Sequence, residues 1–198
     1  MKKGALSSRL ALALAPLALA SLVLLSQSRP SRAQEARAAP GAPSAAEREH
    51  LIAAAREIMT AQTYCAFITV DRDGRPQART INPYPPEEDL MVWFATNILS
   101  RKVQEIRDNP HVVVYYADHS AATGYVALSG RAVLVSDKAE IDRRRRAYWA
   151  QVFPGDRNLV LVKVVPERLD VINYKAGTKM DSVTWRSPSI ELGPAPKK

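Results

Sequence analysis

The sequence is poor in the residues that build disulfides and metal sites, with 1 cysteine and 3 histidines in 198 residues. Without a second thiol, Cys65 cannot form an intrachain disulfide, and its apolar, strand-like surroundings predict a small buried hydrophobe. His50, His111 and His119 are too scattered for metal-ligand spacing, so no zinc or iron site is predicted. No Ser/His/Asp arrangement or carboxylate pair stands out either. The chain therefore shows no sign of a disulfide framework, a metal centre or a hydrolytic triad.

Long apolar runs are absent except near the start of the chain. Lys2, Lys3 and Arg9 accompany a leucine- and alanine-rich run at residues 10–25, and residues 31–33 (Ser-Arg-Ala) offer small side chains to a signal peptidase. At about 16 residues the run is short for ~30 Å of hydrocarbon, so we expect no stable membrane anchor. Residues 1–33 are therefore interpreted as a cleaved signal peptide, which predicts an exported protein, periplasmic or secreted. No cysteine follows the run and no Arg-Arg pair precedes it, which argues against a lipoprotein and favours export of an unfolded chain.

A strong excess of positive charge is also missing once the signal peptide is removed. The full chain has 28 Lys and Arg against 20 Asp and Glu, but residues 1–33 hold five of the cations and none of the acids, which leaves +3 for the mature chain. Export and this balance argue against a nucleic-acid partner. The one dense run is four arginines at residues 143–146, and four successive residues cover a whole helix circumference, so at least one must face the core or a partner. The run is either a solvated face, with Tyr148 and Trp149 packed inward, or a contact for an anionic substrate or a second subunit.

The rest of the chain is expected to form one domain. Residues 34–43, rich in Ala, Pro and Gly, are expected to be a disordered tether, and residues 44–198 the folded part. A capping box at residues 44–47 opens a helix to about residue 60, residues 71–74 signal a hairpin, and Gly130 suggests a bulge or a barrel bend inside a strand. Spacing predicts strands at 64–70, 76–82, 90–95, 111–117, 124–135, 159–165 and 167–174, and further helices starting at Ser100 and spanning 137–152. Six to seven mostly hairpin-linked strands with flanking helices predict a mainly β (α+β) antiparallel barrel.

The most informative segment spans residues 79–102. Arg79 lies in one strand-like run, and the next run ends in a Thr-Asn turn at residues 96–97, followed by Ser-Arg-Lys at residues 100–102. Hydroxyls, free backbone N–H groups and the helix dipole at such a helix start favour an anion. Arg79, from the neighbouring strand, is suited to hold a phosphate with two hydrogen bonds. The alternative is a serine N-cap followed by two solvated cations.

These residues resemble the FMN-binding segment of the pyridoxamine 5'-phosphate oxidase-like flavoproteins, a family with a split β-barrel fold. That family shows an arginine followed by apolar residues on one strand, then an aromatic-x-Thr-Asn turn and Ser-Arg-Lys. Here the elements are residues 79–82 (Arg-Thr-Ile-Asn), 94–97 (Phe-Ala-Thr-Asn) and 100–102. The resemblance covers about residue 46 to residue 172. It implies an FMN-binding split β-barrel and a homodimer with the flavin between two protomers. Because the sequence has no motif for covalent flavin attachment, the FMN would be bound non-covalently.

The resemblance also implies a role for each position of the segment. The flavin phosphate would be held by Arg79, Ser100, Arg101 and Lys102. The ring and the ribityl chain would be lined by backbone atoms of Thr80, Ile81 and Asn82, together with Ala95 and Thr96. Tyr125 stands where family members often place a glutamine against the flavin pyrimidine edge. A tyrosine can stack or donate one hydrogen bond, but it cannot replace a bidentate amide.

Pyridoxine chemistry itself is not expected. True pyridoxamine phosphate oxidases carry a lysine where this chain has Tyr84, and an Arg-x-His motif that this chain lacks. The likeness is closer to the general stress-protein-like members, which implies an FMN-dependent oxidoreductase whose substrate is unknown. Tyr84 and His119 are the groups expected to meet a small-molecule substrate or electron donor. Because a chain exported unfolded cannot carry FMN with it, the alternative is a non-catalytic binder of flavin, haem or deazaflavin on the same fold.

Overall fold

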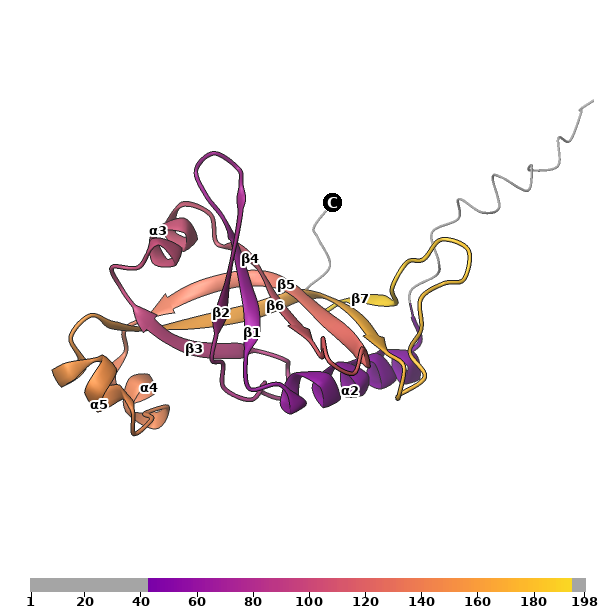
Figure 1. The fold of residues 1–198 in the computed structure, drawn as a ribbon, viewed down its shortest axis with the longest axis horizontal. Helices are drawn as coiled ribbons and strands as arrows, with labels where there is room; N and C mark the ends of the chain where they lie inside the picture. The colour runs from indigo at the N-terminus through magenta and orange to yellow at the C-terminus, as the bar shows by residue number, and fades with distance from the viewer. Residues whose placement is uncertain (1–42, 194–198) are drawn as a thin grey trace, which may run out of the picture. The chain divides into compact units, whose positions relative to one another are not determined.

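A computed structural model describes residues 43–193 of the chain (Figure 1). The expected signal peptide, and all but the last residue of the expected tether, lie outside the described residues. Within the described part, no helix is both long enough and apolar enough to cross a membrane.

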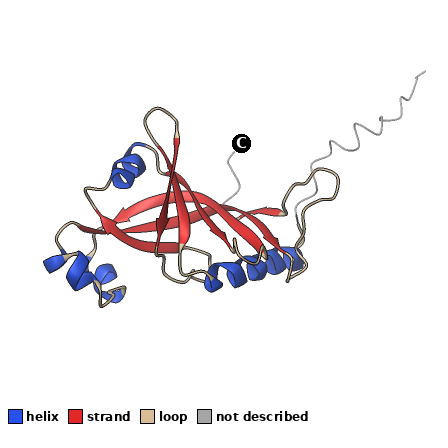
Figure 2. Ribbon diagram, viewed as in Figure 1, coloured by secondary structure: helices blue, strands red, loops and turns tan. Residues whose placement is uncertain are grey.

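Seven antiparallel strands form one strongly curved sheet in the order β2-β1-β4-β5-β6-β3, with β7 paired to β6 (Figure 1). The strands are β1 (Cys65–Val70), β2 (Pro76–Ile81), β3 (Val92–Asn97), β4 (His111–Ala117), β5 (Gly124–Val135), β6 (Leu159–Asn173) and β7 (Ser189–Glu191). The helices are α2 (Ala45–Ala61), α3 (Arg101–Asp108), α4 (Lys138–Arg143) and α5 (Trp149–Val152), followed by the 3-10 turn η1 (Pro154–Asp156). They lie around the sheet (Figure 2). The predicted mainly β architecture with flanking helices is confirmed, and β2 and β3 stand at opposite ends of the strand order.

The first hairpin forms at the turn that the sequence predicts. The side-chain oxygen Oδ1 of Asp71 accepts hydrogen bonds from two backbone N–H groups of the turn, at 3.0 and 2.9 Å. Gly74 has a φ of 80°, a conformation that glycine adopts without strain. The resulting register places Arg79 opposite the buried Phe67. Because side chains alternate along a strand, Arg79 lies on the core-facing side of β2.

The last long strand differs from the prediction of two separate strands. Residues 159–165 and 167–174 belong almost entirely to one strand, β6. It pairs with β5 from Leu161 to Asn173, with β3 in its first half and with β7 in its second half. Pro166 lacks an N–H group, but it lies where the β5–β6 register shifts between Ser129 and Gly130, so the strand continues through it. A Cβ atom on Gly130 would lie 2.2 Å from the carbonyl oxygen of Val165. The predicted bulge at Gly130 is thus confirmed.

The main core lies between the inner face of the sheet and α2. Ser44 caps this helix as predicted, since its hydroxyl accepts a hydrogen bond from the N–H group of Glu47 at 3.2 Å. Cys65 is buried, as predicted, and burial raises the pKa of its thiol to about 12. The helix residues that enter this core are Leu51, Ala54, Ala55, Ile58 and Met59.

The helix predicted over residues 137–152 is interrupted. α4 ends before Arg144, whose carbonyl oxygen accepts a hydrogen bond from the Tyr84 hydroxyl rather than from the next helical turn. The Arg144 side chain is the member of the arginine run that faces inward, with its guanidinium 3.6 Å from the ring centre of Trp93. Trp149 is buried as predicted, whereas Tyr148 is exposed. A second, smaller core forms here from Trp93, Ile141, Trp149, Phe153, Leu159 and Leu161.

Candidate functional site

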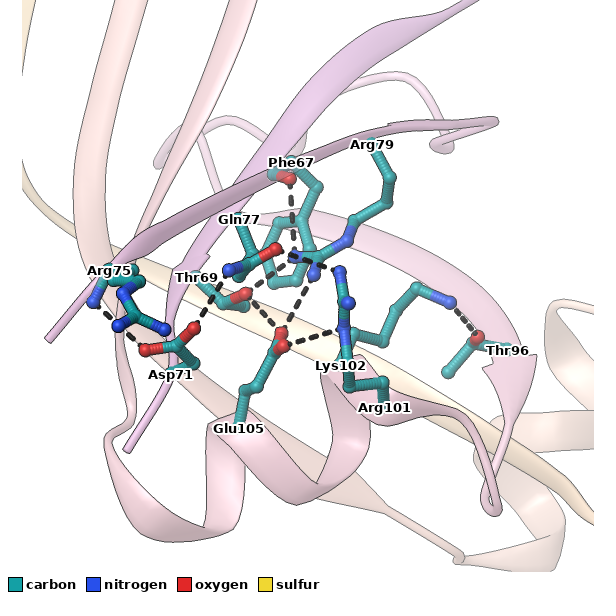
Figure 3. A network of polar contacts seen from close by, with 10 residues as sticks. All are labelled: Phe67, Thr69, Asp71, Arg75, Gln77, Arg79, Thr96, Arg101, Lys102 and Glu105. Atoms are coloured by element: carbon teal, nitrogen blue, oxygen red, sulfur yellow. Dashed lines mark hydrogen bonds and ion pairs between the residues drawn. The ribbon is translucent and has the colours of Figure 1, made fainter. Parts of the chain in front are cut away.

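Helix α3 contacts β2 and β3, the first and last strands of the sheet order, through its side chains. Glu105 of the helix accepts a hydrogen bond from Arg79 of β2, and Lys102 donates one to Thr96 of β3 (Figure 3). Arg101, in the first turn of the helix, also reaches Glu105. We call Arg79, Arg101, Lys102 and Glu105 the cationic cluster.

The turn before α3 determines where its cations lie. Oδ1 of Asn97 accepts a hydrogen bond from the N–H group of Leu99 at 2.8 Å, and the N–H group of Ser100 donates to the Asn97 carbonyl oxygen at 3.0 Å. These two bonds close a tight Asx-type turn directly after β3. The turn therefore places Arg101 and Lys102 at the helix N-terminus, where backbone N–H groups and the helix dipole add partial positive charge.

Glu105 is the centre of the cluster and is almost completely buried. Its Oε2 atom lies 2.7 Å from Nη2 of Arg79, and its Oε1 atom lies 3.0 Å from Nε of Arg101. The Thr69 hydroxyl donates a further hydrogen bond to Oε2 at 2.5 Å. A buried carboxylate needs partners of this kind because burial without them is costly.

Lys102 is half-buried and lacks a carboxylate of its own. Its Nζ atom donates to the Thr96 hydroxyl at 3.0 Å, and within residues 43–193 no carboxylate lies in ion-pair distance of it. Burial lowers the pKa of Lys102, the nearby positive charge of Arg79 lowers it further, and Glu105 acts in the opposite direction. An anion placed beside Lys102 would restore the charge balance that the protein itself leaves incomplete.

Ser100 occupies the N-cap position of α3, but its hydroxyl does not cap the helix. The Oγ atom is buried and has no hydrogen-bond partner among the described residues. The alternative prediction, a serine N-cap followed by two solvated cations, is therefore wrong in two respects: the Ser100 hydroxyl does not cap the helix, and Lys102 is half-buried rather than solvated. A free hydroxyl at a helix N-terminus, next to cations, is suited to donate to an anion.

The cationic cluster can therefore bind a doubly charged anion. It holds three cations and one carboxylate, a net charge of +2. The Ser100 hydroxyl and the N-terminal N–H groups of α3 add uncharged donors at the start of the same helix. This donor set fits the phosphate of a monoester, which carries nearly two negative charges at neutral pH.

The other predicted residues of the segment flank the cluster on the same two strands. Thr80 has an exposed side chain, Ile81 is buried in the main core, and Asn82 directly follows β2. The carbonyl oxygen of Asn82 accepts a hydrogen bond from Arg146 at 3.4 Å. Ala95 is half-buried and precedes Thr96 at the end of β3. The structure thus places both expected lining segments beside the phosphate candidates.

Tyr125 is the predicted residue that the structure does not bring to this cluster. It lies at the start of β5, which β1 and β4 separate from β2 in the sheet order. It alternates with the buried Val126, so its side chain projects from the outer face of the sheet, whereas Arg79 projects from the inner face. Its ring stacks on Tyr115, with 5.6 Å between the ring centres. Within one protomer, Tyr125 and the cationic cluster form separate features.

Tyr84, one of the two groups expected to meet a substrate, is used to hold the structure together. Its hydroxyl donates to the carbonyl oxygen of Arg144, and the Arg146 guanidinium lies 4.0 Å from its ring centre. Burial raises the pKa of the Tyr84 hydroxyl. His119, the second expected group, is exposed in the loop between β4 and β5.

Sequence reasoning missed Glu105 and Thr69, although both left a signal. Glu105 follows Arg101 by four residues, the spacing of an intrahelical ion pair. Thr69 is a polar residue on the core-facing side of β1, in line with Cys65 and Phe67. A carboxylate beside an expected anion site carries the wrong charge for that site, so the sequence alone does not indicate a role for Glu105. The described residues contain no group of three or more His, Cys, Asp or Glu that could hold a metal ion.

Comparison with known proteins decides the family. A family model described as pyridoxamine 5'-phosphate oxidase matches residues 51–173, more than half of the chain. The chain belongs to the pyridoxamine 5'-phosphate oxidase family. A search of curated proteins gave no match.

Solved structures agree with this assignment. General stress protein 26 from Bacillus anthracis is 25% identical with a TM-score of 0.54, covering 62% of this chain and 94% of its own. A Clostridium acetobutylicum protein related to general stress protein 26 is 14% identical with a TM-score of 0.59, covering 72% of this chain and 95% of its own. A haem-binding protein from Mycobacterium smegmatis is 14% identical with a TM-score of 0.54, covering 76% of this chain and 59% of its own. The last two show the shared fold, and together with the family match they confirm the split-barrel architecture.

Proposed function

We propose that this chain is an exported, FMN-dependent oxidoreductase of the pyridoxamine 5'-phosphate oxidase family. The observation that carries the proposal is the cationic cluster, with its net charge of +2 and the free Ser100 hydroxyl beside it. The family membership supports a flavin as the phosphorylated ligand. Export is supported by the sequence of residues 1–33 alone.

In this proposal the FMN phosphate is held by Arg79, Ser100, Arg101 and Lys102. Bound FMN supplies the hydride and electron chemistry that no side chain can provide. The protein's own residues bind the phosphate, and the backbone of residues 80–82 and 95–96 lies beside it. Arg146 steadies that lining, because it donates to the carbonyl oxygens of Asn82 and Pro83, at 3.4 and 2.8 Å. The substrate or electron donor would be a small molecule.

We also propose that two copies of the chain form a homodimer through the outer face of β1, β4 and β5. This face carries half-buried apolar side chains, namely Ala66, Ile68, Val113, Tyr115, Tyr125 and Ala127. An apolar sheet face of this kind is expected to be covered by a partner. In such a dimer, Tyr125 would reach the flavin of the other protomer, which explains its separation from the cluster in one chain. A single-chain mass in light scattering at micromolar concentration would contradict this assembly.

A second candidate is a protein that binds haem or another cofactor without catalysis. It is favoured by the fold shared with the Mycobacterium smegmatis haem-binding protein and by the difficulty of exporting FMN inside an unfolded chain. The two candidates differ in whether the bound cofactor carries a phosphate monoester. The cationic cluster has a function in the first, whereas a haem protein does not require a site for a phosphate monoester.

Binding of FMN and of riboflavin to the ligand-free protein tests the proposal directly, because riboflavin has the same ring without the phosphate. We expect Lys102→Met to weaken FMN binding by about 1.5–3 kcal/mol, roughly 10- to 100-fold in Kd, since one charge-assisted hydrogen bond is lost. Riboflavin binding should not change. Flavin fluorescence quenching measures both.

The matched control is Arg107→Met, which removes an exposed cation from the last turn of the same helix. It should leave the Kd for FMN within about twofold, because exposed charges contribute little at physiological salt. If the Arg107 variant loses as much affinity as the Lys102 variant, or if the wild type binds riboflavin as tightly as FMN, the phosphate site is misplaced.

A further inference from the structure

The hydrogen bonds of Arg79 are distributed unevenly around its guanidinium. Nη1 donates to Thr69 Oγ1 at 2.5 Å and to the Phe67 carbonyl oxygen at 3.5 Å, and Nη2 donates to Glu105 Oε2 at 2.7 Å. No hydrogen bond from Nε is found among the described residues, so the Nε–H group and the second hydrogen of Nη2 remain available as donors. Two such donors of one guanidinium can hold the oxygens of a phosphate.

Arg101 forms an ion pair with the other oxygen of the same carboxylate. Its Nε atom lies 3.0 Å from Glu105 Oε1, which has no hydrogen-bond partner among the described residues, and its Nη2 atom donates to Gln77 Oε1 at 2.9 Å. Gln77 is held in turn by Asp71, whose Oδ2 atom accepts from its amide at 2.8 Å. Figure 3 shows Glu105 in contact with both arginines, with Lys102 directed away toward Thr96. One buried carboxylate is therefore hydrogen-bonded to Arg79 and ion-paired with Arg101.

Glu105 gains little for stability by this arrangement. A buried ion pair roughly offsets its own desolvation cost, and this one also brings a surplus of positive charge into the same place. Its charge also works against an anion bound nearby. The feature that remains as an explanation is orientation, because Oε2 accepts a hydrogen bond from Arg79 and Oε1 lies in ion-pair distance of Arg101, which adds to the contacts that Thr69 and Gln77 make with these arginines.

We infer that Glu105, supported by Thr69, is a positioning residue for the phosphate of the bound cofactor, fixing Arg79 and Arg101 so that their free donors face it. This inference rests on the proposed function. It goes beyond that function because Glu105 is not among the residues proposed to hold the phosphate and would be expected, from charge alone, to repel an anion.

The variant Glu105→Asp separates orientation from charge, because it keeps the carboxylate and shortens its reach by one methylene group. Positioning predicts a Kd for FMN weaker by roughly 10-fold, the loss of about one charge-assisted hydrogen bond, with riboflavin binding unchanged. A role through charge alone predicts no change in either Kd. The control is Gln104→Ala, the exposed neighbour on α3, for which neither ligand should be affected.

A second pair of variants keeps the test decisive if Glu105→Asp does not fold. Thr69→Val removes the hydroxyl at almost constant volume, and Thr69→Ser restores it. Positioning predicts that Thr69→Val weakens FMN several-fold more than riboflavin, and that Thr69→Ser recovers the wild-type ratio.

The inference is overturned if the foldable variants keep the wild-type ratio of FMN to riboflavin affinity, or lose affinity for both ligands in proportion. The proposed function fails in a different way, when the wild type itself shows no preference for FMN over riboflavin.

Discussion

Lys102 is the residue whose charge depends most directly on a ligand. In the ligand-free protein its pKa is lowered by burial and by Arg79, with a smaller opposing effect from Glu105. Its amine therefore loses the proton at a lower pH than an ordinary lysine. A phosphate beside it favours the protonated form, so binding and protonation support each other.

This linkage predicts how FMN affinity depends on pH. Affinity should be highest from about pH 7, where the phosphate dianion is fully formed, up to the lowered pKa of Lys102, and should fall as pH rises through that value. Lys102→Arg should abolish the alkaline fall, because a guanidinium stays charged. Titration of FMN from pH 6 to pH 10, corrected by riboflavin for ionisation of the ring, measures this. An alkaline fall of equal size in the Lys102→Arg variant would assign it to another group.

The candidate site shows which residues a sequence can reveal. Arg79, Arg101 and Lys102 could be predicted because cations at a strand end and at a helix start point to one place. Glu105 could not, because its role depends on the hairpin register that brings Arg79 and Thr69 opposite α3. Nor could the sequence show that the Ser100 hydroxyl is left without a partner, since a serine at a helix start normally caps it.

At the scale of elements, the contact between β5 and β6 holds the two halves of the sheet together. β6 pairs with β5 from Leu161 to its end at Asn173, and carries β3 and β7 on its other edge. The break in register at Gly130 and Pro166 lets one continuous strand serve both partners. β3 carries Thr96 of the candidate site, so the geometry of the bulge also affects where the cluster lies.

We expect Gly130→Ala to destabilise the fold. The added Cβ would lie 2.2 Å from the Val165 carbonyl oxygen, so the two strands must move apart. Overpacking of this kind costs about 1–3 kcal/mol, and a domain of this size loses roughly 2–4 °C of Tm per kcal/mol. Thermal unfolding followed by circular dichroism measures it, with Ser129→Ala as the control on the opposite face. If the Tm of Gly130→Ala lies within about 1 °C of the Tm of Ser129→Ala, the strands can separate without a measurable loss of stability.

Elements were predictable where one local signal determines them. The N-cap at Ser44 and the turn at Asp71 are decided by residues next to them in sequence, and the register shift at Gly130 is marked by the glycine itself. The interrupted helix after Asp137 is not, because it is ended by a hydroxyl that arrives from Tyr84, far away in the chain. Local propensity favours a continuous helix there, and a tertiary contact overrides it.

At the scale of the whole molecule, the expected cofactor residues divide between the two faces of one curved sheet. The cationic cluster lies on the inner side of β2, and Tyr125 projects from the outer side of β5. The homodimer proposed above would account for this division, since each face would then contribute to a different half of the same site. The sequence alone identifies these residues, and the alternation along β2 and β5 assigns them to opposite faces.

The function of the whole molecule is tested on mature protein purified from the periplasm. We expect its N-terminus at Gln34, because small residues at positions 31 and 33 define the cleavage site. We expect flavin absorption bands, which NADH or NADPH should bleach anaerobically and oxygen should restore, since an oxidoreductase must let electrons enter and leave its flavin. A Soret band instead would favour the haem-binding alternative. Flavin bands that neither nucleotide bleaches within minutes at millimolar concentration would exclude a nicotinamide-dependent reductase, and an uncleaved chain in the membrane fraction would contradict export as a free protein.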